Sequence, residues 1–297
     1  MQAKIVVNPV AGGGSSVKAL PQVKKQLDNE NVNYEIVRTD FPGHATELAG
    51  KLEYSGAKIV AMGGDGTVRE VINGIRSPDT SMGIIPTGMG NDFARSLGIP
   101  TNVSKATQYL NSPVTRKVDL GVERGKYFNV MGVGFPAHVV ERINKYKKGP
   151  VGGPLIYLLG LVRSVGDLAT YEFHLELDGE TRDQKANAIF VMNSRFTAGG
   201  LKLAPQAKLD DGLLDVAIIS GVGRLELLLA LKSAFRGDHV NHPKIEFLRA
   251  RKVRIESKAR LLKMFDGELE GTTPAELEVD PKARTITVPQ PPDHRII

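Results

Sequence analysis

A chain of 297 residues with 41% hydrophobic and 24% charged residues can form two ordinary domains and is too apolar to be a disordered protein. The formal net charge of +6 indicates a partner with negative charge, such as a nucleotide, an anionic lipid surface or a nucleic acid. The absence of cysteine excludes disulfides, thiolate metal sites and a cysteine nucleophile.

The first third of the chain alternates short β-branched runs with stretches whose apolar residues recur at helical spacing. The expected strands are Ile5–Val7, Tyr34–Val37, Lys58–Met62 and Met82–Ile85, and the expected helices are Leu20–Leu27, Ala45–Tyr54 and Val68–Ile75. This alternation predicts a parallel sheet covered by helices, a Rossmann-like α/β nucleotide-binding domain over residues 1–124. Ligands of such sheets bind at the carboxyl ends of the strands.

From Lys117 onward the pattern changes to many strands separated by turns such as Asp178-Gly179. The expected strands are Val118–Val122, Lys126–Val133, Glu172–Leu177, Ala186–Met192, Leu213–Ile219, Arg251–Ile255 and Thr285–Val288, and helices are expected around Leu155–Ala169 and Arg224–Phe235. We therefore predict a C-terminal antiparallel β-sandwich domain over residues 125–297, whose last few residues pack back on the first domain.

The sequence enters an apparent strand within Met1–Val7, so we expect no signal peptide. No uncharged apolar run reaches the ~18–20 residues that a membrane span needs. The most apolar segment, Pro154–Val162, ends at Arg163. We therefore expect a cytoplasmic protein that can also act peripherally at the inner face of the membrane.

The strongest local pattern is Met62-Gly63-Gly64-Asp65-Gly66-Thr67, between an expected strand and an expected helix. Glycines let backbone N–H groups approach a phosphate, and a helix N-terminus adds partial positive charge. Asp65 would repel a phosphate unless Mg²⁺ or a nucleotide sugar partners it. The structural alternative is a tight turn in which Asp65 or Thr67 caps the helix.

Two further Gly-rich segments, Asn8–Ser16 and Pro86–Arg95, follow the first and fourth expected strands. In a parallel sheet all three segments end at the same edge, and three independent turns explain that coincidence poorly. The P-loop, dinucleotide and protein-kinase patterns are absent from the sequence, which disfavours those enzyme classes. Tryptophan is absent too and few aromatics interleave with the basic residues, so we expect no nucleic-acid partner.

Four motifs together resemble the bacterial diacylglycerol kinase-related lipid kinases, which share their nucleotide-binding domain with diacylglycerol, ceramide and sphingosine kinases. They are Gly63–Thr67, Glu70–Gly74, Pro86–Gly88 and Gly90–Arg95, and the resemblance continues over the whole chain. It implies transfer of the γ-phosphate from ATP, with Mg²⁺, to a lipid hydroxyl such as that of diacylglycerol. It also implies a lipid partner at a membrane surface, and it leaves a homodimer open. Two alternatives remain: an NAD kinase-like phosphotransferase on a soluble acceptor, and a catalytically silent nucleotide- or lipid-binding protein.

Carried onto this sequence, the resemblance implies a nucleotide site and a charged network near the transferring phosphate and its Mg²⁺. The nucleotide site would comprise Asn8, Pro9, Gly12, Thr39, Gly63, Gly64, Asp65, Gly66, Thr67, Glu70, Met89 and Asn91, and the network Asp65, Asp92, Arg95 and Asp119. The chain departs from the family pattern at Gly13, where a basic residue is usual, at Met89, where Thr is usual, and at Arg69, where Asn is common. These departures leave the nucleotide preference open.

The segment Met264–Glu268 contains the candidate proton acceptors. Phosphoryl transfer requires positioned phosphates, Mg²⁺ and a group that accepts the proton of the attacking hydroxyl. If the segment is extended, Asp266 and Glu268 share one side of it and face one site. The alternative is an ordinary hairpin turn. The resemblance implies a catalytic acid in this Asp-Gly-Glu, in a reaction between the two domains, and we favour Glu268 with Asp266 as the alternative.

The segment Lys208–Asp215 combines carboxylates with an Asp-Gly turn. One carboxylate plus backbone carbonyls suits a hard cation such as Mg²⁺. The resemblance implies a structural Mg²⁺ held by the Asp211 side chain and the carbonyls of Lys208 and Leu213, and the alternative is a turn without an ion.

Two apolar and two basic segments bear on the lipid. Leu155–Val162 and Leu225–Leu231 would either line a cleft for an acyl chain or belong only to the core. Arg142–Lys148 and Lys244–Lys263 would either contact an anionic membrane or form solvated faces.

Overall fold

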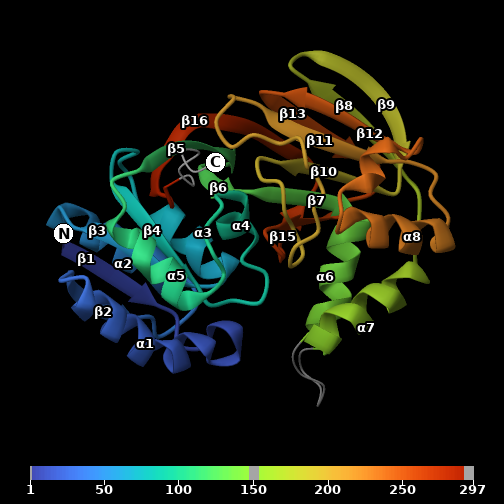
Figure 1. Ribbon diagram of the computed structural model, residues 1–297. Helices are drawn as coiled ribbons and strands as arrows, with labels where there is room; N and C mark the ends of the chain where they lie inside the picture. Colours follow the sequence, from blue (N-terminus) through green and yellow to red (C-terminus); the bar gives the residue numbers. More distant parts are fainter. Residues whose placement is uncertain (1, 147–153, 291–297) are drawn as a thin grey trace, which may run out of the picture. The chain divides into compact units, whose positions relative to one another are not determined.

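The computed structural model of the chain describes residues 2–146 and 154–290 (Figure 1). The chain divides into two compact units, Met1–Val118 with Lys282–Ile297, and Asp119–Pro281. Two strands cross this division, β5 (Thr115–Glu123) and β16 (Ala275–Thr287). Within the described ranges, no helix is both long and apolar enough to cross a membrane.

The first unit is an α/β domain around a parallel sheet with the strand order β2-β1-β3-β4. Its strands are β1 (Gln2–Val7), β2 (Asn33–Arg38), β3 (Lys58–Gly63) and β4 (Ser81–Pro86). Its α-helices are α1 (Ser15–Asn29), α2 (His44–Leu52), α3 (Asp65–Gly74), α4 (Asp92–Ser96) and α5 (Val103–Gln108). Short 3-10 helices are η1 (Ala11–Gly13), η2 (Glu53–Ser55) and η3 (Tyr109–Asn111). The predicted α/β fold is confirmed, and α4 and α5 were not anticipated.

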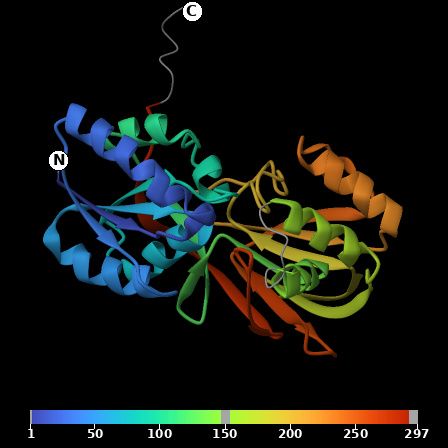
Figure 2. The ribbon, with the colours of Figure 1, turned by 90° about the horizontal axis from the view of Figure 1, so that it is seen from below.

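The central strands of the first unit's sheet are buried on both faces. Almost every residue of β3 and β4 is buried, as expected for parallel strands covered by helices on each side. Helix α1 packs on α5 and α2 packs on α3. Figure 2 shows α1, in dark blue, and α2, in lighter blue, on opposite sides of the strands. The end of β16 pairs in parallel with β4 through Thr285 and Ile286, so the chain returns to this sheet.

The second unit contains two antiparallel sheets. One has the order β12-β11-β10-β7-β14-β15. Its strands are β7 (Val130–Gly134), β10 (Ala188–Met192), β11 (Leu214–Ile219), β12 (Ile245–Ala250), β14 (Leu262–Phe265) and β15 (Glu268–Thr272). The other joins β8 (Tyr171–Leu177), β9 (Glu180–Ala186), β13 (Lys252–Ser257), β16, β5 and β6 (Lys126–Phe128).

These two sheets pack face to face as a sandwich. One buried apolar cluster takes Phe173 and Ile255 from one sheet and Val191, Val216 and Phe265 from the other. Three helices form a second apolar cluster with residues of the six-stranded sheet. They are α6 (Phe135–Tyr146), α7 (Pro154–Val165) and α8 (Arg224–Ala234), and η4 (Asp238–Asn241) follows α8. The predicted β-sandwich is confirmed.

The structure corrects several of the predicted elements in this unit. The single strand expected over Lys126–Val133 is wrong, because Asn129 separates β6 from β7. Helix α6 and strands β9, β12, β14 and β15 were not anticipated. Strand β9 (Glu180–Ala186) is polar along most of its length and has no regular apolar alternation, so only the turn before it signals its presence.

Candidate active site

The loops that follow β1, β3 and β4 lie against one another, with backbone close to backbone. A Cβ added at Gly88 would lie 2.4 Å from the Cα of Gly64, and one added at Gly12 would lie 2.3 Å from the carbonyl oxygen of Thr87. Only glycine permits such approaches. The buried hydroxyls of Ser16 and Thr87 are 2.7 Å apart and join the first loop to the third. The three loops therefore form one structure at the carboxyl ends of the strands.

Asn8 and Thr67 tie the first loop to the start of α3. The side-chain amide of Asn8 donates to the Thr67 hydroxyl at 3.0 Å, and its carbonyl oxygen accepts the N–H of Val10 at 3.1 Å. Pro9 continues this loop. Gly63 ends β3 and has no room for a side chain, because its Cβ would lie 2.4 Å from Thr67.

Asp65 occupies the first position of α3, and Gly66 follows it in the first turn. Its carboxylate accepts the N–H of Phe93 at 3.2 Å, so it caps the start of the short helix α4. Burial raises the pKa of the Asp65 carboxyl, although backbone N–H groups at the start of α4 oppose the shift. A partly buried carboxylate whose charge is disfavoured is stabilised by a nearby cation, which suits a residue expected beside Mg²⁺.

Asn91 closes the third loop. It adopts a left-handed backbone conformation with φ of 54°, and its side chain both accepts from and donates to Gly88, at 2.9 and 2.8 Å. Met89, at the tip, is 52% exposed. Asp92 begins α4, and Arg95 donates from Nε to the carbonyl of Gly90 at 3.0 Å. The loop thus keeps its shape through its own contacts.

Two residues of the predicted nucleotide site also have structural contacts. The two carboxylate oxygens of Glu70 accept the N–H groups of Gly43 and Ala45, at 3.0 and 3.1 Å, and so cap the start of α2. Thr39 is buried just beyond β2, and its N–H donates to the carbonyl of Val7 at 2.9 Å. These contacts fix the position of α2 and of the end of β2.

In the second unit, the Asp-Gly-Glu segment is a hairpin turn and not an extended segment. Asp266 and Gly267 both have positive φ, 49° and 87°, and form the two-residue connection between β14 and β15. The expectation that Asp266 and Glu268 share one side of a strand is therefore wrong. The turn gives the two carboxylates different surroundings.

Asp266 fastens this turn to the strand beside it. Its N–H donates to the carbonyl of Val130 at 2.8 Å, and its carboxylate accepts the N–H groups of Val130 at 2.9 Å and of Asn129 at 3.2 Å. Glu268 is exposed, and within the described ranges its carboxylate makes no hydrogen bond or ion pair. Glu268 is thus open to a substrate, while Asp266 is engaged with the backbone.

A chain of hydrogen bonds inside the second unit joins this turn to Asp119. The buried Asn193 donates its N–H to the carbonyl of Asn129 at 2.9 Å, and its side-chain amide donates to the carbonyl of Asp119. Asp119, itself buried, accepts the N–H of Gly212 at 2.7 Å. Asn129 and Asn193 therefore connect Asp266 to Asp119, and sequence reasoning missed both. In the sequence they appear only as a polar residue within an apolar run, Asn129, and one at the end of an apolar run, Asn193.

The loop predicted to hold Mg²⁺ is rich in oxygen. The Asp211 carboxylate accepts the N–H of Leu213 at 3.3 Å and lies 3.5 Å from the Arg249 guanidinium. Arg249 also lies 3.4 Å from the buried Asp215, whose second oxygen is buried without a hydrogen-bond partner. Burial raises the pKa of the Asp215 carboxyl. Carboxylates and carbonyls are the donors that Mg²⁺ prefers, so the residues fit the ion in kind, although Arg249 already offsets part of their charge.

The same tripeptide occurs a second time in this unit. Asp178-Gly179-Glu180 connects β8 to β9, with φ of 50° and 92° at its first two residues. The Asp178 carboxylate accepts the N–H groups of Arg251 and Lys252, at 2.9 and 2.8 Å, as Asp266 does at the other hairpin. The turn geometry alone therefore does not mark a catalytic position. What distinguishes Asp266 is the hydrogen-bonded chain that leads to Asp119.

The basic segments are largely engaged in ion pairs. In Lys244–Lys263, three examples are Lys244 with Glu226 at 2.6 Å, Lys258 with Glu172 at 3.0 Å, and the buried Lys263 with Glu123. In Arg142–Lys148, Arg142 pairs with Asp167 and Lys145 with Glu141, while Lys147 and Lys148 lie outside the described residues. These pairs favour structural faces over a free membrane-binding charge.

The apolar segments differ from one another. In Leu155–Val162, the side chains of residues 155–159 lie outside those that the structure describes. In Leu225–Leu231, Leu227 is buried in the core, whereas Leu225 and Leu229 are 71% and 61% exposed. The second segment therefore has a core face and a solvent face.

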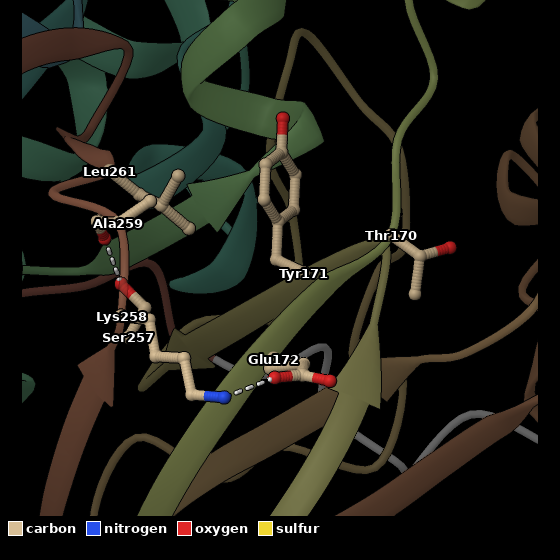
Figure 3. Close-up of a pocket in the computed structure, with 7 residues that line it drawn as sticks. All are labelled: Thr170, Tyr171, Glu172, Ser257, Lys258, Ala259 and Leu261. Atoms are coloured by element: carbon tan, nitrogen blue, oxygen red, sulfur yellow. Dashed lines mark hydrogen bonds and ion pairs between the residues drawn. The ribbon is translucent and has the colours of Figure 1, made fainter.

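Figure 3 shows a pocket elsewhere in the second unit. Thr170, Tyr171, Glu172, Ser257, Lys258, Ala259 and Leu261 line it. The Lys258–Glu172 ion pair crosses it, and none of the predicted site residues is among its lining.

Comparison with known proteins places both units. Residues 2–122 match the diacylglycerol kinase catalytic domain, and residues 129–288 match the YegS C-terminal NAD kinase beta sandwich-like domain. A diacylglycerol kinase of Staphylococcus saprophyticus is 31% identical over 276 residues, which cover 92% of this chain and 90% of that protein. A diacylglycerol kinase of Bacillus subtilis is 31% identical over 282 residues, 93% of this chain and 92% of that protein.

The chain belongs to the diacylglycerol kinase-related family of lipid kinases. A crystal structure of a diacylglycerol kinase from Bacillus anthracis agrees with this assignment, with a TM-score of 0.79 at 27% identity and coverage of 97% of both chains. The family resemblance stated from the sequence is thus confirmed.

Proposed function

We propose that this lipid kinase transfers the γ-phosphate of ATP to the hydroxyl of diacylglycerol. The observation that carries the proposal is the set of three backbone-packed glycine loops at the carboxyl ends of β1, β3 and β4, in a chain similar over nine-tenths of its length to diacylglycerol kinases. Residues Asn8–Gly12, Gly63–Thr67 and Gly88–Asn91 bind the phosphates through backbone N–H groups and the N-terminus of α3. Asp65, Asp92 and Arg95 set the charge around them.

Glu268 accepts the proton of the lipid hydroxyl, and Asp266 positions Glu268. Glu268 takes the proton from the lipid hydroxyl, the hydroxyl oxygen forms a bond to the γ-phosphorus, and the bond to the β,γ-bridging oxygen breaks to release ADP. Exposure of Glu268 supports this role, because an acceptor needs direct access to the hydroxyl. The backbone hydrogen bonds that the Asp266 carboxylate accepts from Asn129 and Val130 fix the turn that carries Glu268.

Mg²⁺ serves two purposes in this proposal. Near Asp65 it would bind with the nucleotide and would neutralise the phosphate charge. The Asp211 side chain and the carbonyls of Lys208 and Leu213 would hold a second ion, which would strengthen the loop that contacts Asp119. Buried oxygens around that loop, including the unpartnered one of Asp215, support the second site.

The test of the reaction is transfer from γ-labelled ATP to separate acceptors. Diacylglycerol, a sphingoid base and phosphatidylglycerol are presented in mixed micelles, and NAD in solution, with the wild-type chain and Asp65→Ala. The proposal predicts labelled diacylglycerol with the wild type and loss of transfer in Asp65→Ala. Label in NAD alone would indicate a soluble acceptor. ATP binding without transfer to any acceptor would indicate a silent binding protein.

The structural Mg²⁺ site has a readout that does not depend on activity. Added MgCl₂, without nucleotide, should raise the midpoint of thermal unfolding of the wild type and leave Asp211→Asn unchanged. The neighbouring exposed residue provides the control, because Asp210→Asn should respond like the wild type. If added Mg²⁺ leaves the unfolding midpoint of the wild type unchanged, the structural Mg²⁺ site is wrong.

A further inference from the structure

The outer face of α8 carries an unusual concentration of exposed apolar side chains. Among residues 2–145 and 160–290, whose side-chain exposure the structure describes, eleven large hydrophobic side chains are exposed, and four of them lie on α8 or directly after it. Leu225, Leu228, Leu229 and Phe235 are exposed by 71%, 38%, 61% and 57%. The leucines are spaced by three and four residues and so form one stripe. We call these four residues the outer face of α8.

The helix itself is firmly seated, so the stripe does not result from loose packing. Leu227 and Ala234 are buried, and Leu231 packs against the same core cluster. At the N-terminus, the Glu226 carboxylate accepts the N–H of Gly223 at 2.9 Å and the ammonium of Lys244 at 2.6 Å. Figure 2 shows α8, in orange, at the edge of its unit. The sequence has thus placed leucines on both sides of a well-anchored helix.

Basic residues accompany the outer face. Arg224, Lys232 and Arg236 are exposed on the same helix or just beyond its end. Arg224 holds the helix start through a hydrogen bond to the carbonyl of Gly166 at 2.6 Å, and Arg236 lies 3.8 Å from the exposed Asp238. Exposed leucines and phenylalanine between arginine and lysine are typical of helices that lie in the interface of an anionic bilayer.

We propose that the outer face of α8 docks this enzyme on an anionic lipid bilayer, an inference that rests on the proposed reaction with a lipid. The apolar side chains enter the region between headgroups and acyl chains, and Lys232 and Arg236 lie against the phosphates. Within the described residues Lys232 makes no ion pair, unlike Lys244, Lys258 and Lys263 of the basic segment Lys244–Lys263.

A second copy of the chain is the other occupant to consider. A symmetric contact through this face would place the basic residues of α8 near their own copies, because both partners of a two-fold interface use the same patch. Like charges at close range oppose such a contact. Anionic phosphates instead complement them. Charge therefore selects the bilayer over a dimer.

The test is cosedimentation of the full chain with vesicles, measured as a partition coefficient. One set contains equal parts of phosphatidylglycerol and phosphatidylcholine, and the other phosphatidylcholine alone. We expect Leu225→Gln with Leu229→Gln to lower partitioning to the anionic vesicles by about tenfold or more, because two exposed apolar side chains no longer enter the interface. Lys232→Gln should lower it by about fivefold on anionic vesicles, with little effect on neutral ones.

Controls separate docking from folding, from dimerisation and from catalysis. Tyr54→Gln removes a ring that is 75% exposed in the first unit and should partition like the wild type. Circular dichroism should be unchanged in all variants, and transfer to a short-chain diacylglycerol dissolved as monomers should stay at the wild-type rate. Unreactive wild-type protein that still binds vesicles would count against the proposed reaction and not against docking. The inference is overturned if the wild type does not sediment, if the leucine variant sediments equally, or if that variant instead dissociates a dimer in gel filtration.

Discussion

At the scale of single residues, one local rule acts twice with different consequences. Asp178 and Asp266 both adopt left-handed backbone conformations before glycine, and both carboxylates bind two consecutive backbone N–H groups of a neighbouring strand. The Asp-Gly pair can be recognised in the sequence because a two-residue hairpin turn of this kind requires positive φ at both residues. The hydrogen-bond partners of the two carboxylates cannot be recognised, because Asp266 and Asn129 are more than a hundred residues apart in the chain.

Asp266→Asn tests the positioning role. Asparagine tolerates the left-handed backbone but removes the charge that accepts the N–H groups of Asn129 and Val130. We expect a loss of about 1.5–3 kcal/mol of stability, the usual contribution of a charged hydrogen bond. We also expect a lower kcat with an unchanged KM for ATP. Urea unfolding and initial-rate kinetics measure the two effects.

Asp178→Asn is the matched control for that substitution. It removes the same kind of contact from the other Asp-Gly-Glu hairpin, so it should lower stability and leave kcat near the wild-type value. If Asp178→Asn lowers kcat as much as Asp266→Asn, the hairpin of Asp266 has no special part in the reaction.

At the scale of elements, α3 depends on a residue that lies far away in the sequence. Arg284, on β16, is buried and donates from Nε and Nη2 to the carbonyl of Ile72, at 3.0 and 2.7 Å, and also to the carbonyl of Ile75. These carbonyls end the helix that begins with Asp65, so the guanidinium satisfies groups that a helix terminus leaves unpaired. The returning strand thereby stabilises the C-terminal end of α3, the end opposite Asp65.

Arg284→Met should destabilise the chain strongly. The substitution keeps an unbranched apolar side chain in place of the arginine stem but leaves two buried carbonyls without their donors, at a cost of about 3 kcal/mol or more. Arg76→Met, at an exposed arginine just after the same helix, should change stability by less than about 1 kcal/mol. The midpoint of urea unfolding distinguishes the two, and equal effects would show that Arg284 does not support α3.

The element after α8 gives the second unit a pH dependence. His239, in η4, is buried, and its ring donates to the carbonyl of Leu203 at 2.9 Å. Burial lowers the pKa of His239 below its ordinary value of 6.5. Below pH 6.5 His239 binds a proton in the unfolded chain but not in the folded chain. The contribution of His239 to the free energy of unfolding is therefore fully present above pH 6.5 and is lost as the pH falls.

His239→Gln keeps a nitrogen donor for the Leu203 carbonyl and removes the titration. The difference in unfolding free energy between the wild type and this variant should shift against the wild type as the pH falls below 6.5, by up to about 1.4 kcal/mol per pH unit. Unfolding in urea at a series of pH values gives the slope. Parallel curves for the two proteins would refute the assignment.

At the scale of the whole molecule, local patterns predicted the classes of the two units better than their connections. The apolar runs of β3 and β4 and the glycine loops after them indicated a parallel sheet. A strand that is buried on both faces is apolar along its whole length, and this pattern can be recognised in the sequence. The sequence did not predict the polar strand β9, because pairing with β8 in a hairpin determines it. It did not predict the break at Asn129 either, because the distant Asp266 carboxylate determines that break. The candidate residues were found through motifs, whereas Asn129 and Asn193 appear only once the fold brings them together.

The most direct measurement of the central claim is the rate of phosphate transfer from labelled ATP to diacylglycerol by Glu268→Gln, beside Glu180→Gln. Both substitutions neutralise the glutamate of an Asp-Gly-Glu hairpin. Loss of a proton acceptor costs about 10²–10⁴ in kcat, so the account predicts such a loss for Glu268→Gln with an unchanged KM for ATP, and a rate near the wild type for Glu180→Gln. A Glu268→Gln enzyme as active as Glu180→Gln would contradict the account.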